Sequence, residues 1–292
     1  MITTRGVGME SSGWRSGFVE CDEGRLRVLL AGERGSPVLL LSGAGVDNAL
    51  LSWRHLIPAL AERHRVFALD WPKQGASRPW RGHAGHERML RCVTEVLDHF
   101  GVDAVDLVGL SQGGALTLAY AIDEPQRVSR LVAIAPAGVV SFPVGVHQLL
   151  WLTAKVALLN RTVPNWMLRS RASVRSFVRR GLVPTPPDDV DDLVDEVQAE
   201  VRAHGAASSD WQNSSIGFRR MHVDLRPRLQ EISCPALFLQ GDRDVAIRPK
   251  HTLAAAARVP NARLELLPGH GHWPNRQSPA RVNTMIGNFL AE

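Results

Sequence analysis

Short runs rich in apolar residues recur along the chain and alternate with segments of helical periodicity. A strand that is buried on both faces of a sheet has a nearly continuous apolar sequence. After an opening hairpin over residues 17–21 and 25–30, the runs cover 37–41, 66–69, 105–110, 128–134, 236–240 and 263–267. Strands that alternate with helices predict an α/β fold, with a mostly parallel central sheet of about eight strands and helices on both faces.

The segments between these runs predict the helices. Apolar positions spaced for one helical face mark residues 50–63 and 86–100, and Gly101 is a C-cap candidate for the second helix. Asp47 or Asn48 is expected to cap the first. Further helices are expected after the run at 105–110 and over 251–258 and 278–290.

Between about residues 139 and 232 the strand signal disappears and helical segments dominate. We therefore divide the chain into an α/β core, residues 1–138 and 233–292, and a helical cap (lid) insertion, residues 139–232. Within the cap, the turn Pro184-Thr185-Pro186-Pro187 separates an arginine-rich part from an acidic part. Opposite charge blocks of this kind are usually solvated helix faces.

Composition narrows the classes of function. The 292 residues suffice for one large domain with an insertion, and 45% apolar with 22% charged residues is typical of a soluble globular protein. The net charge of +5 comes with no basic helix and no aromatic-interleaved basic run, so we expect no nucleic-acid partner. The scattered Cys21, Cys92 and Cys234 lack metal-ligand spacing, which favours a reduced, cytoplasmic protein without metal or cofactor.

The chain has no segment that predicts a membrane partner. Residues 1–16 are polar, which argues against a signal peptide, and no apolar run approaches the about 20 residues that span a bilayer. We expect a monomer or homodimer that binds a small apolar substrate.

The run at 105–110 leads directly into Gly109-Leu110-Ser111-Gln112-Gly113, and a helix-like run follows at once. A strand, a Gly-x-Ser-x-Gly turn and a helix in this order predict a nucleophile elbow. Gly109 and Gly113 keep β-carbons out of the crowded approach of strand and helix. The helix start aims free N–H groups at the place where an oxyanion would form.

Ligands of open α/β sheets bind at the carboxyl ends of the strands. The other candidate catalytic side chains are therefore those that follow the remaining strands. Asp70 follows one strand, Asp242 and Asp244 follow another, and His270 and His272 follow the last. A serine hydroxyl needs a base in contact, and the base needs a carboxylate to orient it. Serine, acid and histidine in this chain order are expected of an α/β-hydrolase triad.

On these motifs the chain resembles the α/β-hydrolase superfamily, in the form with a serine nucleophile and a helical cap. The resemblance spans about residues 17–290 and includes the Asp-Trp-Pro-x-x-Gly-x-Ser loop from Asp70. It implies the α/β-hydrolase fold and a triad of Ser111, Asp244 and His272. Asp244 follows Gly241 by three residues, and His272 lies in Gly271-His272-Trp273, as in the family.

The resemblance also implies an oxyanion hole made of the backbone N–H groups of Ala44 and Gln112. The family usually has His-Gly after the strand that ends at Leu41, and this chain has Ser42-Gly43 instead. A backbone donor does not need the histidine, but the support of the loop is expected to differ.

The cap is expected to select the substrate. Aromatic-lined clefts bind apolar groups, and the alternative for each tryptophan is packing within the core of the cap. The candidates for the substrate site are Gly43, His147, Trp151, Trp166, Met167, Trp211 and Trp273. A cap arginine is a further candidate for holding a substrate carboxylate, and the sequence does not select one.

Three activities remain open. A serine at the elbow favours acyl chemistry, so the first reading is a carboxylesterase-like serine hydrolase of an ester, thioester or lactone. Gly271-His272-Trp273 is also similar to the meta-cleavage-product hydrolases, which split carbon–carbon bonds, although Leu110 replaces the polar asparagine of that family. The third reading is a hydrolase scaffold used as a small-molecule receptor.

Overall fold

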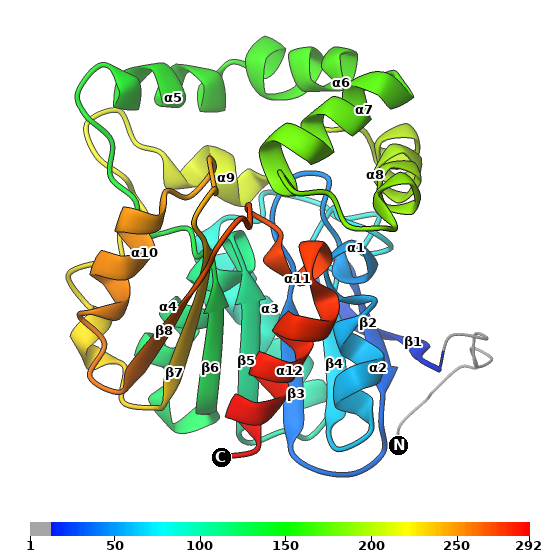
Figure 1. The fold of residues 1–292 in the computed structure, drawn as a ribbon, viewed down its shortest axis with the longest axis vertical. Coiled ribbons are helices and arrows are strands. Elements are labelled where there is room, and N and C mark those ends of the chain that lie inside the picture. The colour runs from blue at the N-terminus through cyan, green and yellow to red at the C-terminus, as the bar shows by residue number, and fades with distance from the viewer. Residues whose placement is uncertain (1–12) are drawn as a thin grey trace.

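The computed structural model describes residues 13–292 and contains one eight-stranded sheet (Figure 1). The expectation of no signal peptide rests mostly on residues 1–12, which lie outside the described residues. The strands are β1 Arg15–Cys21, β2 Gly24–Ala31, β3 Pro37–Leu41, β4 Arg65–Leu69, β5 Val105–Leu110, β6 Val128–Ile134, β7 Ala236–Gly241 and β8 Ala262–Leu267. Their order is β1-β2-β4-β3-β5-β6-β7-β8; β2 pairs antiparallel with β1 and β4, and the other neighbours are parallel. The predicted sheet and its class are confirmed.

Alternate residues of the central strands pack in two separate hydrophobic clusters, one on each face of the sheet. Leu39 and Leu107 belong to one cluster, with residues of α3, α4 and α10, whereas Leu40 and Val108 belong to the other, with residues of α1, α2 and α12. Helices therefore cover both faces of the sheet, as the continuous apolar runs require. These helices are α1 Ala49–Trp53, α2 Leu56–Ala61, α3 His86–His99, α4 Gln112–Asp123, α10 Pro249–Ala256 and α12 Pro279–Leu290, with the short α11 Pro274–Gln277 and the 3-10 turns Pro125–Arg127 and Leu229–Glu231.

One predicted helix is wrong in detail. Residues 50–63 form two short helices, α1 and α2, in place of a single one. Pro58 has no N–H to donate to the carbonyl of Arg54, so the hydrogen-bond ladder breaks between the two helices.

The segment between β6 and β7 is helical and lies over the carboxyl ends of the strands (Figure 1). It contains α5 Val146–Lys155, the π-helical turn Leu158–Thr162, α6 Val163–Met167, α7 Arg171–Phe177, the π-helical turn Val178–Leu182, α8 Val190–His204 and α9 Asp210–Ser215. Buried side chains of α7 and α8 join the cluster of α1, α2 and α12, so this part packs on the core. Within residues 13–292, no helix combines the length and the apolar character needed to cross a bilayer.

Candidate active site

Ser111 lies at the sharp turn between β5 and α4. Its φ of 54° and ψ of −110° place it in a conformation that non-glycine residues rarely adopt, at a cost of about 1–3 kcal/mol. Its N–H donates to the carbonyl of Ile134 at 2.9 Å, and its carbonyl accepts from the N–H groups of Ala115 at 3.0 Å and Ala137 at 2.9 Å. These bonds hold the serine, which is only half-buried, at the carboxyl edge of the sheet.

Gly109 and Gly113 are required by the close contacts of this turn. A β-carbon on Gly109 would lie 2.3 Å from the carbonyl oxygen of Gly113, and one on Gly113 would lie 2.0 Å from that of Leu41. Both distances are too short for real atoms, so a larger residue would force the strand and helix apart. The prediction that these glycines keep β-carbons out of the elbow is confirmed.

His272 and Asp244 are brought together from the loops after β8 and β7. Nδ1 of His272 lies 2.8 Å from Oδ2 of Asp244, and both residues are more than nine-tenths buried. Gln240 Nε2 also donates to Oδ2 at 3.1 Å, while Oδ1 accepts from the amides of Ala246 at 2.8 Å and Ile247 at 2.9 Å. A carboxylate so fixed selects the tautomer with hydrogen on Nδ1, which leaves Nε2 as a base.

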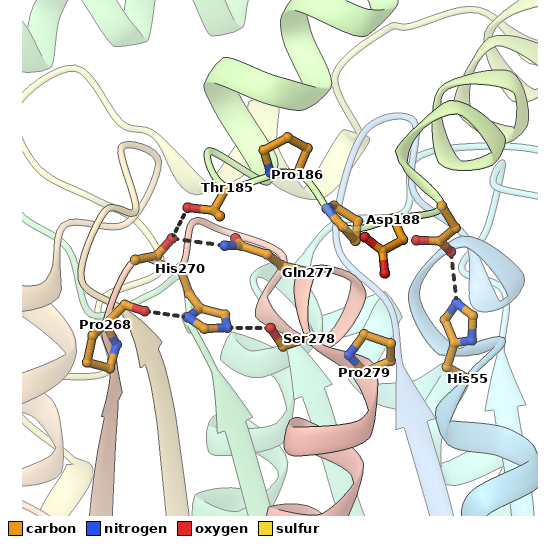
Figure 2. A pocket seen from close by; sticks show the side chains of 12 residues that line it. His55, Thr185, Pro186, Asp188, Pro268, His270, Gln277, Ser278 and Pro279 are labelled. Carbon is orange, nitrogen blue, oxygen red and sulfur yellow. Dashed lines mark hydrogen bonds and ion pairs between the residues drawn. The ribbon is translucent and has the colours of Figure 1, made fainter.

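The neighbouring alternatives, Asp242 and His270, have other partners. Oδ1 of Asp242 accepts from the N–H of Gly269 at 2.7 Å. The His270 ring lies between the carbonyl of Pro268 and the hydroxyl of Ser278, at 2.8 Å from each (Figure 2). Both residues therefore brace the loop after β8, and Asp244 and His272 are the pair in contact. Their catalytic roles remain predictions.

A pocket of about 650 Å³ opens beside His270. Thr185 Oγ1 and Gln277 Nε2 both donate to the carbonyl of Gly269 there, at 3.1 and 2.9 Å (Figure 2). The inserted segment therefore packs directly on the loop that carries His272. Ser111 is not among the residues that line this pocket, so it is separate from the elbow. The lining comes from residues 55, 185–189, 268–270 and 277–279.

The predicted oxyanion donors lie on the loop after β3 and at the start of α4, which approach each other at the elbow. A β-carbon on Gly43 would lie 3.6 Å from Cβ of Ser111, so the loop after β3 passes close to the serine. Gln112 is buried at the start of α4. Within residues 13–292, the backbone N–H groups of Ala44 and Gln112 donate to no protein acceptor. Both are free to bind an oxyanion, and this role remains a prediction.

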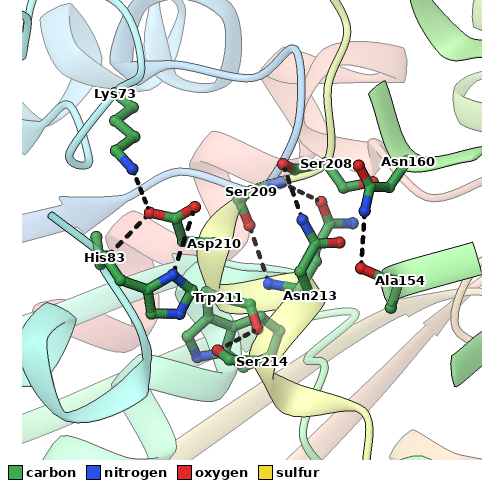
Figure 3. Close-up of polar contacts among 12 residues, drawn as sticks. Lys73, His83, Ala154, Asn160, Ser208, Ser209, Asp210, Trp211, Asn213 and Ser214 are labelled. Atoms are coloured by element: carbon green, nitrogen blue, oxygen red, sulfur yellow. Dashed lines mark hydrogen bonds and ion pairs between the residues drawn. The ribbon is translucent and has the colours of Figure 1, made fainter. Parts of the chain in front are cut away.

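The helix α9 links the inserted segment to the core (Figure 3). Oδ2 of Asp210 accepts from Lys73 Nζ at 2.6 Å and from the amide of Ala84 at 2.9 Å. The preceding Ser209 donates its hydroxyl to Oε1 of Gln112 at 2.6 Å. The inserted segment is thus bonded to the first residue of the elbow helix.

Trp211 and Trp273 lie in packed surroundings. Trp211 is 4% exposed, and its Nε1 donates to Nδ1 of His86 in α3 at 2.9 Å. Trp273 is also buried, and its backbone N–H donates to the carbonyl of Leu182 at 3.1 Å. Both residues belong to the main hydrophobic clusters, so they pack as core residues. Trp211 packs in the cluster that contains α3 and α4, and not in a separate core of the cap.

The remaining candidates lie on α5 and α6. His147 Nε2 is 2.7 Å from the carbonyl of Gly217, and the Trp151 ring meets the Phe218 ring edge-on at 5.1 Å. His147 and Trp151 therefore both contact the segment Gly217-Phe218. Trp166, in contrast, is 65% exposed on α6 beside the exposed Met167. Whether these residues contact substrate remains a prediction.

Asp47 is a site residue whose role the sequence did not reveal. Oδ1 of Asn48 accepts from the N–H groups of Leu50 and Leu51, both at 2.9 Å, so Asn48 alone caps α1. Asp47 turns back instead and accepts from the N–H of Gly43 at 2.6 Å. Two features of the sequence could have indicated this contact. Asp47 and Asn48 are two consecutive capping residues before a helix that needs only one, and they follow a loop that lacks the histidine usual in the family.

Comparisons with known proteins identify the family of the chain. A family model described as alpha/beta hydrolase fold matches residues 36–279. The chain is similar to a 2-hydroxy-6-oxo-2,4-heptadienoate hydrolase of Pseudomonas putida, with 43% identity over 267 residues that cover 88% of this chain and 90% of the relative. It is 28% identical to a 2-hydroxymuconate semialdehyde hydrolase of a Pseudomonas species, over 88% of each chain.

Solved structures show the same fold. Carboxylesterase CesB of Bacillus subtilis superimposes with a TM-score of 0.74 at 22% identity, over 95% of this chain and 91% of the other. The enol-lactonase of Burkholderia xenovorans superimposes with a TM-score of 0.73 at 21% identity, over 94% of this chain and the whole of the other.

Proposed function

Because the chain belongs to the α/β-hydrolase fold family, we propose that this hydrolase works through Ser111, with His272 as base and Asp244 as the acid that orients it. The observation that carries the proposal is the 2.8 Å bond between His272 Nδ1 and Asp244 Oδ2. His272 and Asp244 follow β8 and β7, and the strained Ser111 turn follows β5, so all three residues come after the carboxyl ends of strands of one sheet.

The proposed reaction proceeds in two steps. His272 Nε2 removes the hydroxyl proton of Ser111 as the oxygen attacks the substrate carbonyl, and it returns that proton to the leaving group. The N–H groups of Ala44 and Gln112 stabilise the negative oxygen, and losing one such donor typically costs about 3 kcal/mol. In the second step water attacks the acyl-enzyme, and His272 removes a proton from the water. His272 then returns this proton to the oxygen of Ser111 as the acid product leaves.

The first candidate bond is an ester, thioester or lactone with an apolar acyl or alcohol part. These bonds need only the nucleophile, the base and the oxyanion donors. Exposed apolar side chains such as Leu149 and Trp166 lie on α5 and α6, above the carboxyl ends of the strands (Figure 1). These features support an apolar substrate.

A second candidate, carbon–carbon bond hydrolysis, is favoured by the relative at 43% identity. Its name specifies a dienoate with a hydroxyl and a ketone. Cleaving such a substrate requires the same attack on a carbonyl and, in addition, protonation of a carbon leaving group. The site offers the same Ser111, Asp244 and His272 to both candidates.

The proposal is tested by labelling with a fluorophosphonate probe. We expect wild type to be labelled stoichiometrically and Ser111→Ala to remain unlabelled and inactive while keeping its fold by circular dichroism. Asp242→Asn, a change on the same loop as Asp244, is the matched control and is expected to be labelled. Labelling and turnover retained in Ser111→Ala would overturn the assignment.

The two candidate bonds are separated by substrate panels. The kcat/KM values for p-nitrophenyl esters of increasing chain length are compared with those for a vinylogous diketone dienoate. A receptor that keeps the triad would show a stoichiometric burst with the probe but a negligible steady-state rate on both panels.

The cellular setting is also inferred. Cys21, Cys92 and Cys234 are free thiols, and burial raises the pKa of Cys234 to about 11, so that it stays protonated. Unpaired thiols support the expected cytoplasmic location. The expectation of a monomer or homodimer stays a prediction.

A further inference from the structure

The loop after β3 places its peptide groups through contacts from three side chains. The carbonyl of Ser42 accepts from Trp71 Nε1 at 2.9 Å, and the N–H of Gly43 donates to Asp47 Oδ2 at 2.6 Å. These two atoms belong to one peptide group, which is therefore held at both ends. Rotation of this group is blocked as long as both partners stay in place.

The next peptide group contains the predicted oxyanion donor. Its carbonyl, that of Gly43, accepts from Gln74 Nε2 at 3.3 Å, and its N–H is that of Ala44. The carbonyl and N–H of a trans peptide point in opposite directions. With the carbonyl directed at Gln74, the N–H of Ala44 is directed away from it and stays free of protein acceptors within residues 13–292.

Asp47 is built into this loop as a buried acceptor. Its side chain is 1% exposed and accepts three hydrogen bonds, from Gly43 N–H and Ser52 Oγ at 2.6 Å each and from Asn48 N–H at 2.8 Å. A carboxylate that receives only donors is at its strongest as an acceptor when ionised. We propose that Asp47 is a positioning residue of the oxyanion hole, which takes the place of the missing loop histidine by fixing Gly43 so that the N–H of Ala44 faces the reacting carbonyl.

The support of Asp47 extends to the loop of the catalytic base. Ser52, which donates to Asp47, gives its carbonyl to Asn275 Nδ2 at 2.7 Å, and the carbonyl of Leu51 accepts from Arg276 Nη1 at 2.6 Å. Asn275 and Arg276 follow His272 by three and four residues. The oxyanion loop and the histidine loop are therefore joined through α1 and α11.

The charge of Asp47 is expected to make the site sensitive to pH. Burial raises the pKa of Asp47 to about 6, against the hydrogen bonds from Ser52, Gly43 and Asn48 and the nearby charge of Arg276. The other charged groups nearby are Asp70 and Glu200, which bond to the adjacent Ala49 and Asn48, and Glu196, which pairs with Arg276. As pH falls through about 6 the carboxylate gains a proton, and its hold on Gly43 weakens.

The test compares Asp47→Asn with Asp106→Asn. Asp106 is equally buried, but it lies near the amino end of β5, so its loss controls for removing a buried carboxyl. We expect kcat of Asp47→Asn on a p-nitrophenyl ester to fall by about 10- to 100-fold with KM within twofold, because only the transition state carries the oxyanion. We also expect the acid limb of its kcat profile to be shallower than that of wild type, since one titrating group has been removed. Asp106→Asn should keep wild-type kcat and slope.

The inference rests on the proposed function, and the two fail differently. If wild type is not labelled by the fluorophosphonate, the proposed function fails. If wild type is labelled but a folded Asp47→Asn keeps kcat within twofold and the wild-type slope, the role of Asp47 is overturned. Should Asp47→Asn not fold, Ser52→Ala decides: a several-fold loss in kcat at constant KM supports the role, and unchanged kcat overturns it.

Discussion

The sheet edge and the helices above it hold their side chains very differently. At the edge, Asp244 and His272 are almost fully buried, and both oxygens of the carboxylate have hydrogen-bond donors. On α5 and α6, Leu149 is 61% exposed and Trp166 is 65% exposed.

This difference separates two tasks. Groups that act in a transition state must be held to within a fraction of an ångström, which buried and fully bonded side chains achieve. Side chains that receive an apolar substrate gain by burying their surface only when it binds. We therefore expect changes at the edge to affect kcat and changes on α5 and α6 to affect KM.

The largest effect is expected at the acid of the edge. Asp244→Asn should lower kcat by about 10³- to 10⁴-fold, because the amide favours the wrong imidazole tautomer of His272. Steady-state kinetics on the best ester or dienoate measures the loss. Asp242→Asn is the control, and a loss of the same size in both variants would contradict the choice of acid.

The strands and the serine turn of this edge could be predicted from the sequence because their requirements are local. The elbow needs small residues beside Ser111, and the close contacts of Gly109 and Gly113 show why. The strands appear as apolar runs because they are buried on both faces. The order of serine, acid and histidine then follows from the order of the strands along the chain.

The sequence could not assign side chains that have two plausible partners. Asp47 and Asn48 both fit the start of α1, and only the path of the loop after β3 decides that Asp47 turns back to Gly43. The tryptophans pose the same difficulty, since an apolar ring suits a core as well as a pocket. Trp211 is buried against α3 and Trp166 is exposed, a distinction that depends on tertiary packing.

The next largest effect is expected on stability, at Trp211. Trp211→Ala removes a buried indole and its hydrogen bond to His86, which should lower the free energy of unfolding by about 3–5 kcal/mol. Denaturant titration followed by circular dichroism measures it. Since Trp211 lies in α9, which is bonded to the elbow helix through Ser209, a secondary fall in kcat is also expected. A variant with wild-type stability would show that this contact is not formed.

A smaller effect is expected at Trp166, the exposed counterpart. Trp166→Ala should leave stability nearly unchanged, because its ring is already in solvent. If α6 contacts the substrate, KM should rise several-fold for long-chain esters and hardly at all for acetate esters, with kcat preserved. Equal KM values across the chain-length series would remove Trp166 from the substrate site.

The smallest effect is expected where α7 meets α8, although this contact has the densest ion pairs of the inserted segment. Arg171 Nε lies 2.6 Å from Asp195 Oδ1, and Arg171 Nη2 lies 3.1 Å from Asp191 Oδ1, with all three side chains exposed. The hydrogen bond from Arg171 lowers the pKa of Asp195, so any stability the pair contributes is present above the usual carboxyl pKa and is lost only as pH falls through the lowered value. At neutral pH, water and salt screen such pairs, whereas buried Val174 and Val194 hold the two helices together.

Arg171→Ala should therefore shift Tm by less than replicate scatter and leave kcat and KM unchanged, while Val194→Ala lowers Tm clearly. A large Tm loss in Arg171→Ala that added salt reproduces in wild type would show that charge, and not apolar packing, holds this part of the inserted segment in place.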